Sequence, residues 1–97
     1  MAHFSHAYAD GCSIYFTFAG YAPTPQESLD LHHRLWTRAL EACLKHGGTI
    51  SHHHGVGFLK AEAFVREAGP LHGWLKKVKM TLDPHGILNP GKMGLNP

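Results

Sequence analysis

Few features of specialised protein classes occur in this chain of 97 residues. Cysteine occurs only twice, at Cys12 and Cys43, which is too few for a disulfide framework, so we expect both thiols to be reduced. The formal net charge is only +2 and no basic run is interleaved with aromatic residues, which argues against nucleic acid as a partner. No segment approaches the roughly 18 apolar residues of a membrane span, and the first residues lack a signal-peptide pattern. We therefore expect a cytoplasmic protein.

Histidine, in contrast, is abundant. The chain has ten histidines, and three of them are consecutive at His52, His53 and His54, followed by Gly55 and Gly57. Hydrophobic residues make up 43% of the chain and charged residues 16%, a balance typical of a globular protein. The function of the histidine triplet is therefore the main question that the sequence raises.

The N-terminal part predicts a β-hairpin. Residues 12–19 are apolar, aromatic and β-branched, which favours a strand. Residues 2–8 could form a partner strand, with residues 9–11 as the turn. Alternation along the strand places Tyr15 on the same face as two polar neighbours, where its hydroxyl could reach a wet cavity or simply pack on the sheet.

The middle of the chain predicts one long helix over about residues 25–46. Thr24 and Glu27 form a capping-box pattern, Pro25 suits the first helical position, and two glycines end the helix. An apolar stripe recurs at steps of three and four residues: Leu29, His32, Leu35, Trp36, Ala39, Leu40, Cys43 and Leu44.

The remainder predicts two shorter helices and an irregular tail. One helix is expected from after Gly57 to about Arg66 and the other over 70–83, where a following proline ends it. The tail, residues 84–97, contains three prolines and three glycines, and we expect Ile87 and Leu88 to be buried. The fold class is therefore α+β: a small antiparallel sheet packed by one long helix, then two shorter helices. We treat residues 1–97 as a single unit.

Three interpretations of the triplet remain open. In an extended backbone His52 and His54 point to one side and His53 to the other, so a metal ion would need a further ligand such as His3 or His6. The histidines could instead be partly exposed turn residues without a function. A redox cofactor or substrate site fits best, because glycines after a strand let the backbone approach a ligand and imidazoles shuttle protons near neutral pH.

Three stretches, "GCSIYFTF", "GGTISHHHGVGFLK" and "LDPHGILNPGK", occur in an order and spacing that resemble a known family. They are similar to the C-terminal part of FAD-linked oxidases of the vanillyl-alcohol-oxidase type, and within these to the alkyldihydroxyacetonephosphate synthases. The resemblance covers nearly the whole chain. Its histidine stretch is specific, whereas the last stretch is shared across the wider superfamily.

The resemblance implies roles for several residues. Tyr15 matches a tyrosine proposed as acid/base, and His53 and His54 would assist it in catalysis. His52, Gly55, Lys60 and Asn89 would lie on the side of the FAD cofactor.

A related branch, the metal-using 2-hydroxyacid dehydrogenases, resembles this chain less closely. Its pattern G-E-H-G has a metal-ligating glutamate where this chain has His53, and a histidine near the position of Tyr15. No metal ligand is therefore assigned here. His6 still matches the first ligand of that branch, so a fragment of such a dehydrogenase or a small His-rich metal-binding module remains an alternative.

The resemblance also implies a partner within the same polypeptide. We expect this chain to be a C-terminal fragment of the cap or substrate domain, with the FAD-binding domain upstream of it in the whole enzyme. Its substrate would be a small molecule or a lipid. The isolated chain is expected to be inactive, to bind no FAD, and to self-associate through its exposed interface.

Overall fold

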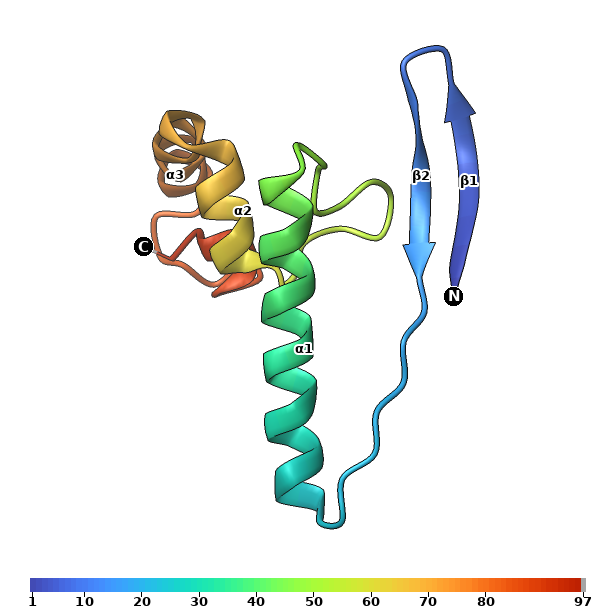
Figure 1. Ribbon diagram of the computed structural model, residues 1–97. Helices are drawn as coiled ribbons and strands as arrows, with labels where there is room; N and C mark the ends of the chain where they lie inside the picture. The colour runs from blue at the N-terminus through green and yellow to red at the C-terminus, as the bar shows by residue number, and fades with distance from the viewer. Residues whose placement is uncertain (97) are drawn as a thin grey trace. The chain divides into compact units, whose positions relative to one another are not determined.

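A computed structural model describes residues 1–96, which divide into two compact units (Figure 1). The first unit is Met1–Thr37, and the second runs from Arg38 to the end of the described residues. One helix, α1 (Pro25–Lys45), is continuous across the boundary. Contacts are concentrated within these two parts, and each is described by itself below.

The first unit begins with an antiparallel hairpin of β1 (Ala2–Tyr8) and β2 (Gly11–Phe16). The hairpin prediction is confirmed, although β2 ends three residues before the predicted end of its strand. Met1 and Thr17 extend the pairing by one step, because each N–H donates to the carbonyl of the other at 2.9 Å.

The hairpin has one apolar and one polar face. Phe4 lies opposite Ile14 across the strands, while His3 lies opposite Tyr15. Because side chains alternate along a strand, these two pairs point to opposite faces. The predicted separation of Tyr15 from its apolar neighbours is thus confirmed. An irregularity between Ser5 and Tyr8 interrupts the register, where His6 has a φ of 51°.

Helix α1 starts at the predicted cap. The Oγ1 of Thr24 accepts from the N–H of Glu27 at 3.3 Å, and a carboxylate oxygen of Glu27 accepts from the N–H of Thr24 at 3.1 Å. Such a reciprocal cap stabilises a helix by about 1 kcal/mol. The segment after β2 runs beside α1, since a Cβ on Gly20 would lie 2.9 Å from Leu31.

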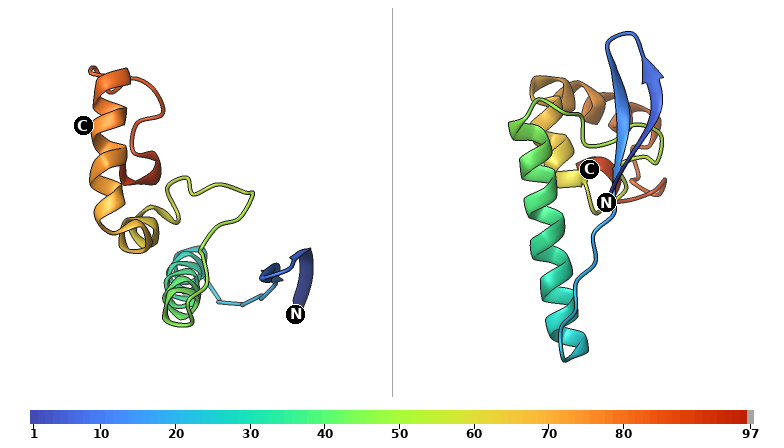
Figure 2. Two further views of the ribbon diagram at one scale, coloured as in Figure 1. Left: turned by 90° about the horizontal axis from the view of Figure 1, so that it is seen from above. Right: turned by 45° about the vertical axis from the view of Figure 1, so that its right-hand side comes forward.

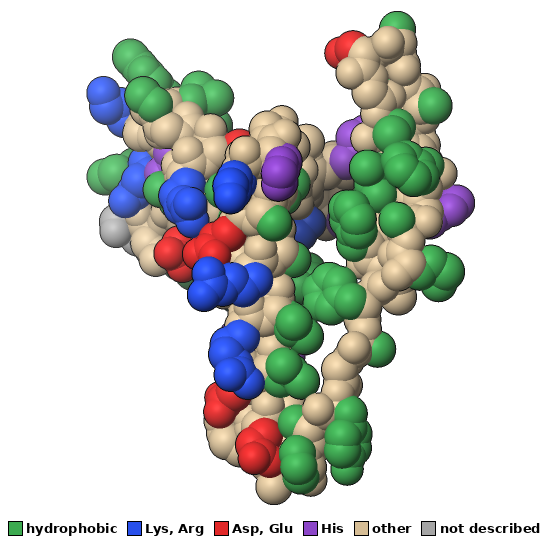
Figure 3. All heavy atoms as spheres, in the orientation of Figure 1, with side chains coloured by type: hydrophobic (Ala, Val, Ile, Leu, Met, Phe, Trp, Pro, Cys, Tyr) green, Lys and Arg blue, Asp and Glu red, His purple; other side chains and the backbone are tan. Residues whose placement is uncertain are grey.

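The apolar stripe of α1 is only partly covered. No residue of α1 is buried, and Leu29 and Leu35 are exposed. Figure 3 shows charged side chains of both signs along the helix beside a strip of apolar ones. The helix prediction is confirmed, but its apolar stripe is not sealed by the described residues.

The second unit contains α2 (Ala61–Ala68), α3 (Pro70–Leu82) and the 3₁₀ turn η1 (Lys92–Gly94). Both short helices were predicted, and α2 begins four residues after Gly57. In the left view of Figure 2, α2 is seen nearly end-on and α3 from the side, while the tail returns beside them.

The tail packs against α2 through η1. The N–H of Met93 donates to the carbonyl of Gly57 at 2.9 Å, and Nε2 of buried His72 lies 3.1 Å from the carbonyl of Met93. Gly94, with a φ of 67°, lies so close that a Cβ would stand 2.9 Å from Val65. The glycines of the tail therefore permit a close approach as well as breaking regular structure.

Asp83 organises the turn between α3 and the tail. Its buried carboxylate accepts from the N–H groups of Ile87 at 3.0 Å and Leu88 at 2.9 Å, and pairs with the ammonium of Lys79. The same ammonium donates to the carbonyl of Leu88. The predicted burial of two apolar residues here is wrong: Ile87 is 75% and Leu88 58% exposed, because their backbones, not their side chains, are tied to Asp83.

The core is small. Among the described residues, the buried hydrophobic side chains are Ile50 and Ala63, at 7% and 6% exposure. No helix within residues 1–96 is both long enough and apolar enough to cross a membrane.

Asp83→Asn is expected to destabilise the fold in a pH-dependent way. The hydrogen bond from Lys79, followed by those from Leu88 and Ile87, holds the pKa of Asp83 below its ordinary value of 3.8, although burial opposes this. The ionised carboxylate therefore stabilises the fold above the unfolded-state pKa, and this contribution is lost as pH falls through the lower folded-state pKa. The melting temperature of the variant should be lower at neutral pH, and the difference should shrink below about pH 4.

Thermal unfolding followed by circular dichroism measures this difference. Asp10→Asn, in the exposed hairpin turn, is the matched control. A deficit for Asp83→Asn that persisted unchanged in acid would contradict the role of the ionised carboxylate.

Candidate functional site

The three histidines lie in a short closed loop, residues 51–55, which we call the histidine loop. Ile50, one of the two buried hydrophobic residues, leads into it. The hydroxyl of Ser51 donates to the carbonyl of Gly55 at 2.8 Å, which closes the loop across its base. Residues 49–51 form no strand, and Ile50 is in a bend. The histidines therefore project from a tight turn.

The imidazole rings of the loop are exposed and contact one another. The Nδ1 atoms of His52 and His53 are 2.8 Å apart, and the ring centroids of His53 and His54 are 4.2 Å apart. A hydrogen bond between two Nδ1 atoms requires one ring to donate and the other to accept, so the two rings hold complementary tautomers. Exposed imidazoles can exchange protons with a bound molecule near neutral pH.

Two glycines leave the backbone open beside the histidines. Gly55 and Gly57 have φ values of 77° and 60°, which L side chains rarely adopt. A Cβ at either position would meet no atom within 4 Å among the described residues. A planar ligand could therefore approach the backbone here without steric conflict.

Helix α2 supports the loop from both of its ends. Lys60, at the N-cap, directs its ammonium to Oγ of Ser51 at 3.4 Å, and Glu67, in the last turn, accepts the N–H of Ile50 at 3.2 Å. Because Lys60, Ala63 and Glu67 are separated by three and four residues, they lie along one face of the helix. The buried Ala63 lies between the two polar anchors on this face.

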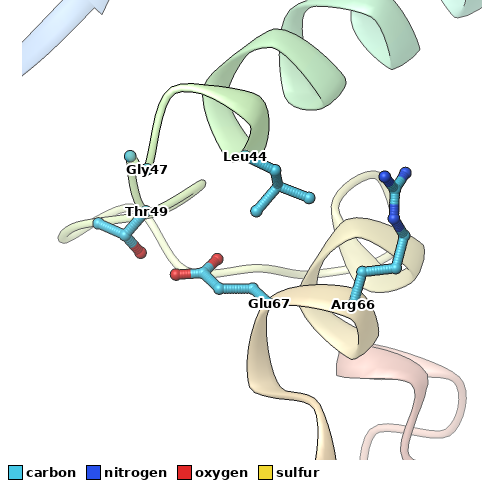
Figure 4. Close-up of a pocket in the computed structure, with 6 residues that line it drawn as sticks. Leu44, Gly47, Thr49, Arg66 and Glu67 are labelled. Atoms are coloured by element: carbon cyan, nitrogen blue, oxygen red, sulfur yellow. The ribbon is translucent and has the colours of Figure 1, made fainter.

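A shallow groove adjoins this support. Its lining comes from the end of α1, the following turn and α2: Leu44, Gly47, Gly48, Thr49, Arg66 and Glu67 (Figure 4). The thiol of Cys43 donates to the carbonyl of Thr49 at 3.4 Å. Burial raises the pKa of this thiol, the Glu67 carboxylate raises it further, and Lys60 opposes the rise. The thiol is therefore a support of the turn, which fits its predicted packing role better than a reactive one.

Tyr15 belongs to the first unit. It is half-buried on the polar face of the hairpin, and its ring centroid is 6.1 Å from that of His3, its partner across the strands. Sequence analysis missed His3 as a neighbour of Tyr15, although cross-strand register could have indicated it. His6, the proposed additional metal ligand, lies in the same unit, and its Nδ1 is 2.7 Å from Oγ of Ser5.

Of the residues predicted to face the cofactor, His52, Gly55 and Lys60 lie together around the histidine loop. Asn89 lies in the tail, where its φ of 47° is one that asparagine tolerates better than most residues, and its carbonyl accepts the N–H of Lys92 at 3.4 Å.

The sequence analysis missed Ser51 and Glu67. Ser51 directly precedes the triplet, and Glu67 follows Lys60 by seven residues on a predicted helix, which is two turns on the same face. The sequence shows these spacings, but it does not show that the loop turns back toward helix α2.

The exposed imidazoles can donate, accept and transfer protons, and the glycines beside them let a ligand approach the backbone, which are properties that an enzyme site uses. Comparison with known proteins agrees: residues 1–93 match the family of FAD linked oxidases, C-terminal domain. The chain belongs to this family, and the predicted resemblance is confirmed.

Several curated proteins are similar to the chain. Alkyldihydroxyacetonephosphate synthase of Trypanosoma brucei brucei is 38% identical over 94 residues, covering 94% of the chain and 15% of the synthase. The synthase of Dictyostelium discoideum is 36% identical over 97 residues, covering 95% of the chain and 15% of the synthase. An uncharacterized FAD-linked oxidoreductase of Escherichia coli is 32% identical over 92 residues, covering 92% of the chain and 19% of that protein. No solved structure matches the chain. The chain thus spans under a fifth of the length of these relatives.

Glu67→Gln is expected to make Cys43 more reactive. The amide oxygen can still accept the N–H of Ile50, but the negative charge that raises the thiol pKa is lost, so the thiolate fraction increases. In a Cys12→Ser background, reaction with a disulfide reagent should become severalfold faster.

Glu62→Gln, in the first turn of the same helix, is the matched control and should leave the rate unchanged. An unchanged rate in Glu67→Gln would contradict the electrostatic coupling of these two residues.

Proposed function

We propose that this chain forms the substrate side of the active site of a longer FAD-dependent enzyme, with an FAD-binding domain in the same polypeptide. More specifically, we propose an enzyme like alkyldihydroxyacetonephosphate synthase, which exchanges the acyl group of acyl-dihydroxyacetone phosphate for the alkyl group of a fatty alcohol. The observation that supports it best is the closed, exposed histidine loop beside two open glycines, in a chain of this family. A cytoplasmic location belongs to the same proposal.

The residues of the loop fit a planar cofactor. A Cβ at Gly55 would meet no described atom within 4 Å, so a cofactor ring could approach the backbone there, and the exposed imidazole of His52 in the same loop offers a hydrogen-bonding edge. Lys60 and Asn89 complete the proposed FAD-side set. When bound, FAD would supply a ring that accepts and returns an electron pair; the protein residues would orient it and exclude water.

Tyr15 and the histidines would handle protons. Tyr15 would act as the acid/base that removes a proton from the substrate carbon next to the carbonyl and later returns it. His53 and His54 would hold the leaving carboxylate and the entering alcohol by hydrogen bonds, and in the hydrogen bond between His52 and His53 one ring donates while the other accepts. Overall, a carbon–oxygen bond to the acid breaks and one to the alcohol forms, so the exchange needs no external oxidant.

A second candidate is dehydrogenation of a hydroxy acid. D-2-hydroxyglutarate dehydrogenase of Stutzerimonas stutzeri is 41% identical over 54 residues, which cover 55% of the chain and 12% of the dehydrogenase. Product analysis separates the two, because the dehydrogenase reduces a stoichiometric acceptor, whereas the exchange reaction releases a fatty acid and consumes none.

The cofactor proposal is tested by absorption. A protein that joins this chain to its FAD-binding domain should purify yellow with bound flavin, whereas residues 1–97 alone should be colourless, inactive and self-associated, because many large apolar side chains are exposed. Visible absorption, activity and light scattering measure these properties. A colourless joined protein, or flavin bound tightly by residues 1–97 alone, would count against the proposal.

The catalytic proposal is tested by substitution in that protein. Tyr15→Phe and His53→Ala should each lower kcat by about 10²- to 10⁴-fold, the range for a lost general acid or base, with flavin content unchanged. Tyr8→Phe, on the other strand, and His85→Ala, an exposed histidine of the tail, are matched controls. Loss of flavin together with activity would instead indicate a structural role.

A further inference from the structure

The hydroxyl of Ser51 occupies a central position at the base of the histidine loop. It donates to the carbonyl of Gly55 at 2.8 Å and lies 3.4 Å from the ammonium of Lys60, which donates to it. A serine hydroxyl has one proton to give and two lone pairs, so both contacts can exist together. One side chain thus connects the two ends of the loop to helix α2.

The neighbours of Ser51 are themselves held in place. The preceding N–H, that of Ile50, is bound by Glu67, and the carbonyl of Ser51 accepts from the hydroxyl of Thr49 at 3.2 Å. Lys60 is fixed because its carbonyl accepts the N–H of Phe64 in α2 at 2.8 Å. The oxygen of Ser51 therefore has a defined position relative to the second unit, and it can transmit that position to the loop.

The closure fixes a residue whose backbone is otherwise permissive. Gly55 has a φ of 77°, and glycine has more conformational freedom than any other residue, so the hydrogen bond from Ser51 removes freedom that the side chain does not limit. The three histidines are exposed and contact each other. Without the hydrogen bond from Ser51 to Gly55, the base of the loop would no longer hold the Nδ1 atoms of His52 and His53 at their spacing.

We infer that Ser51 is a positioning residue of the proposed active site: its hydroxyl, bound by Lys60, closes residues 51–55 and sets the geometry of the imidazoles. This inference rests on the proposed function. It also gives Lys60 a task that differs from direct cofactor contact, since its ammonium acts on the loop through Ser51. A loop held in this way meets bound ligands without first having to be ordered.

The inference is tested with three variants of the protein that carries this chain and its FAD-binding domain. Ser51→Ala removes the closure, and kcat should fall roughly ten- to hundredfold, the range for removing a residue that orients a site residue, with flavin content unchanged. Ser51→Thr retains the hydroxyl and should restore most of kcat. Thr81→Val is the matched control, because it removes another hydroxyl that donates to a backbone carbonyl, that of Lys77 in α3 at 2.9 Å.

A spectroscopic readout separates positioning from general destabilisation. Nitrogen-15 signals of the histidine rings should shift for His52 and His53 in Ser51→Ala, and stay in place in Ser51→Thr and Thr81→Val. Unchanged ring signals and kcat in Ser51→Ala would overturn the inference, as would a loss of kcat that Thr does not restore and that leaves the signals unchanged. If the parent protein lacks flavin-dependent turnover, the proposed function fails, and the ring signals alone still decide whether Ser51 sets the loop geometry.

Discussion

The second unit depends on helix α2, because the loop and the tail are both attached to it. One face carries Lys60, which binds Ser51 at the start of the histidine loop, and Glu67, which binds Ile50 just before it. A different face, which includes Val65, receives the tail at Gly94. A helix of eight residues is too short to be stable by itself. Its hydrogen-bonded partners and the buried Ala63 must therefore stabilise it, just as it positions them.

The described residues bury little apolar surface. The hairpin presents Phe4 and Phe16 at 66% and 69% exposure, and α1 leaves its apolar stripe partly open. Buried polar groups such as Asp83 therefore contribute more to holding the backbone in place than they would in a domain with a large apolar core. In such an arrangement, the loss of one buried hydrogen-bonding group leaves its partners unsatisfied, which costs more than the bond itself contributes.

Much of the fold could be predicted from local sequence. The capping box at Thr24, the proline at Pro25 and the spacing of apolar residues specify α1 almost to the residue, because each acts within one or two turns of helix. The alternation of apolar and polar residues predicted the hairpin, and the positions of glycine and proline predicted the two short helices. The prediction failed for Ile87 and Leu88, since apolar character indicates burial only where another surface covers the residue, and here Asp83 binds their backbone instead.

For the site, the sequence by itself determined the chemistry: three adjacent imidazoles, two glycines beside them, and a family whose members are FAD-linked. Only the tertiary structure decided how the imidazoles are presented. The closure by Ser51, the anchoring by Glu67 and the hydrogen bond between His52 and His53 depend on the angle at which the chain leaves Ile50 and returns at Gly55. That angle is set by packing against α2, which begins ten residues after Ser51, and contacts between separate elements leave no periodic pattern in the sequence.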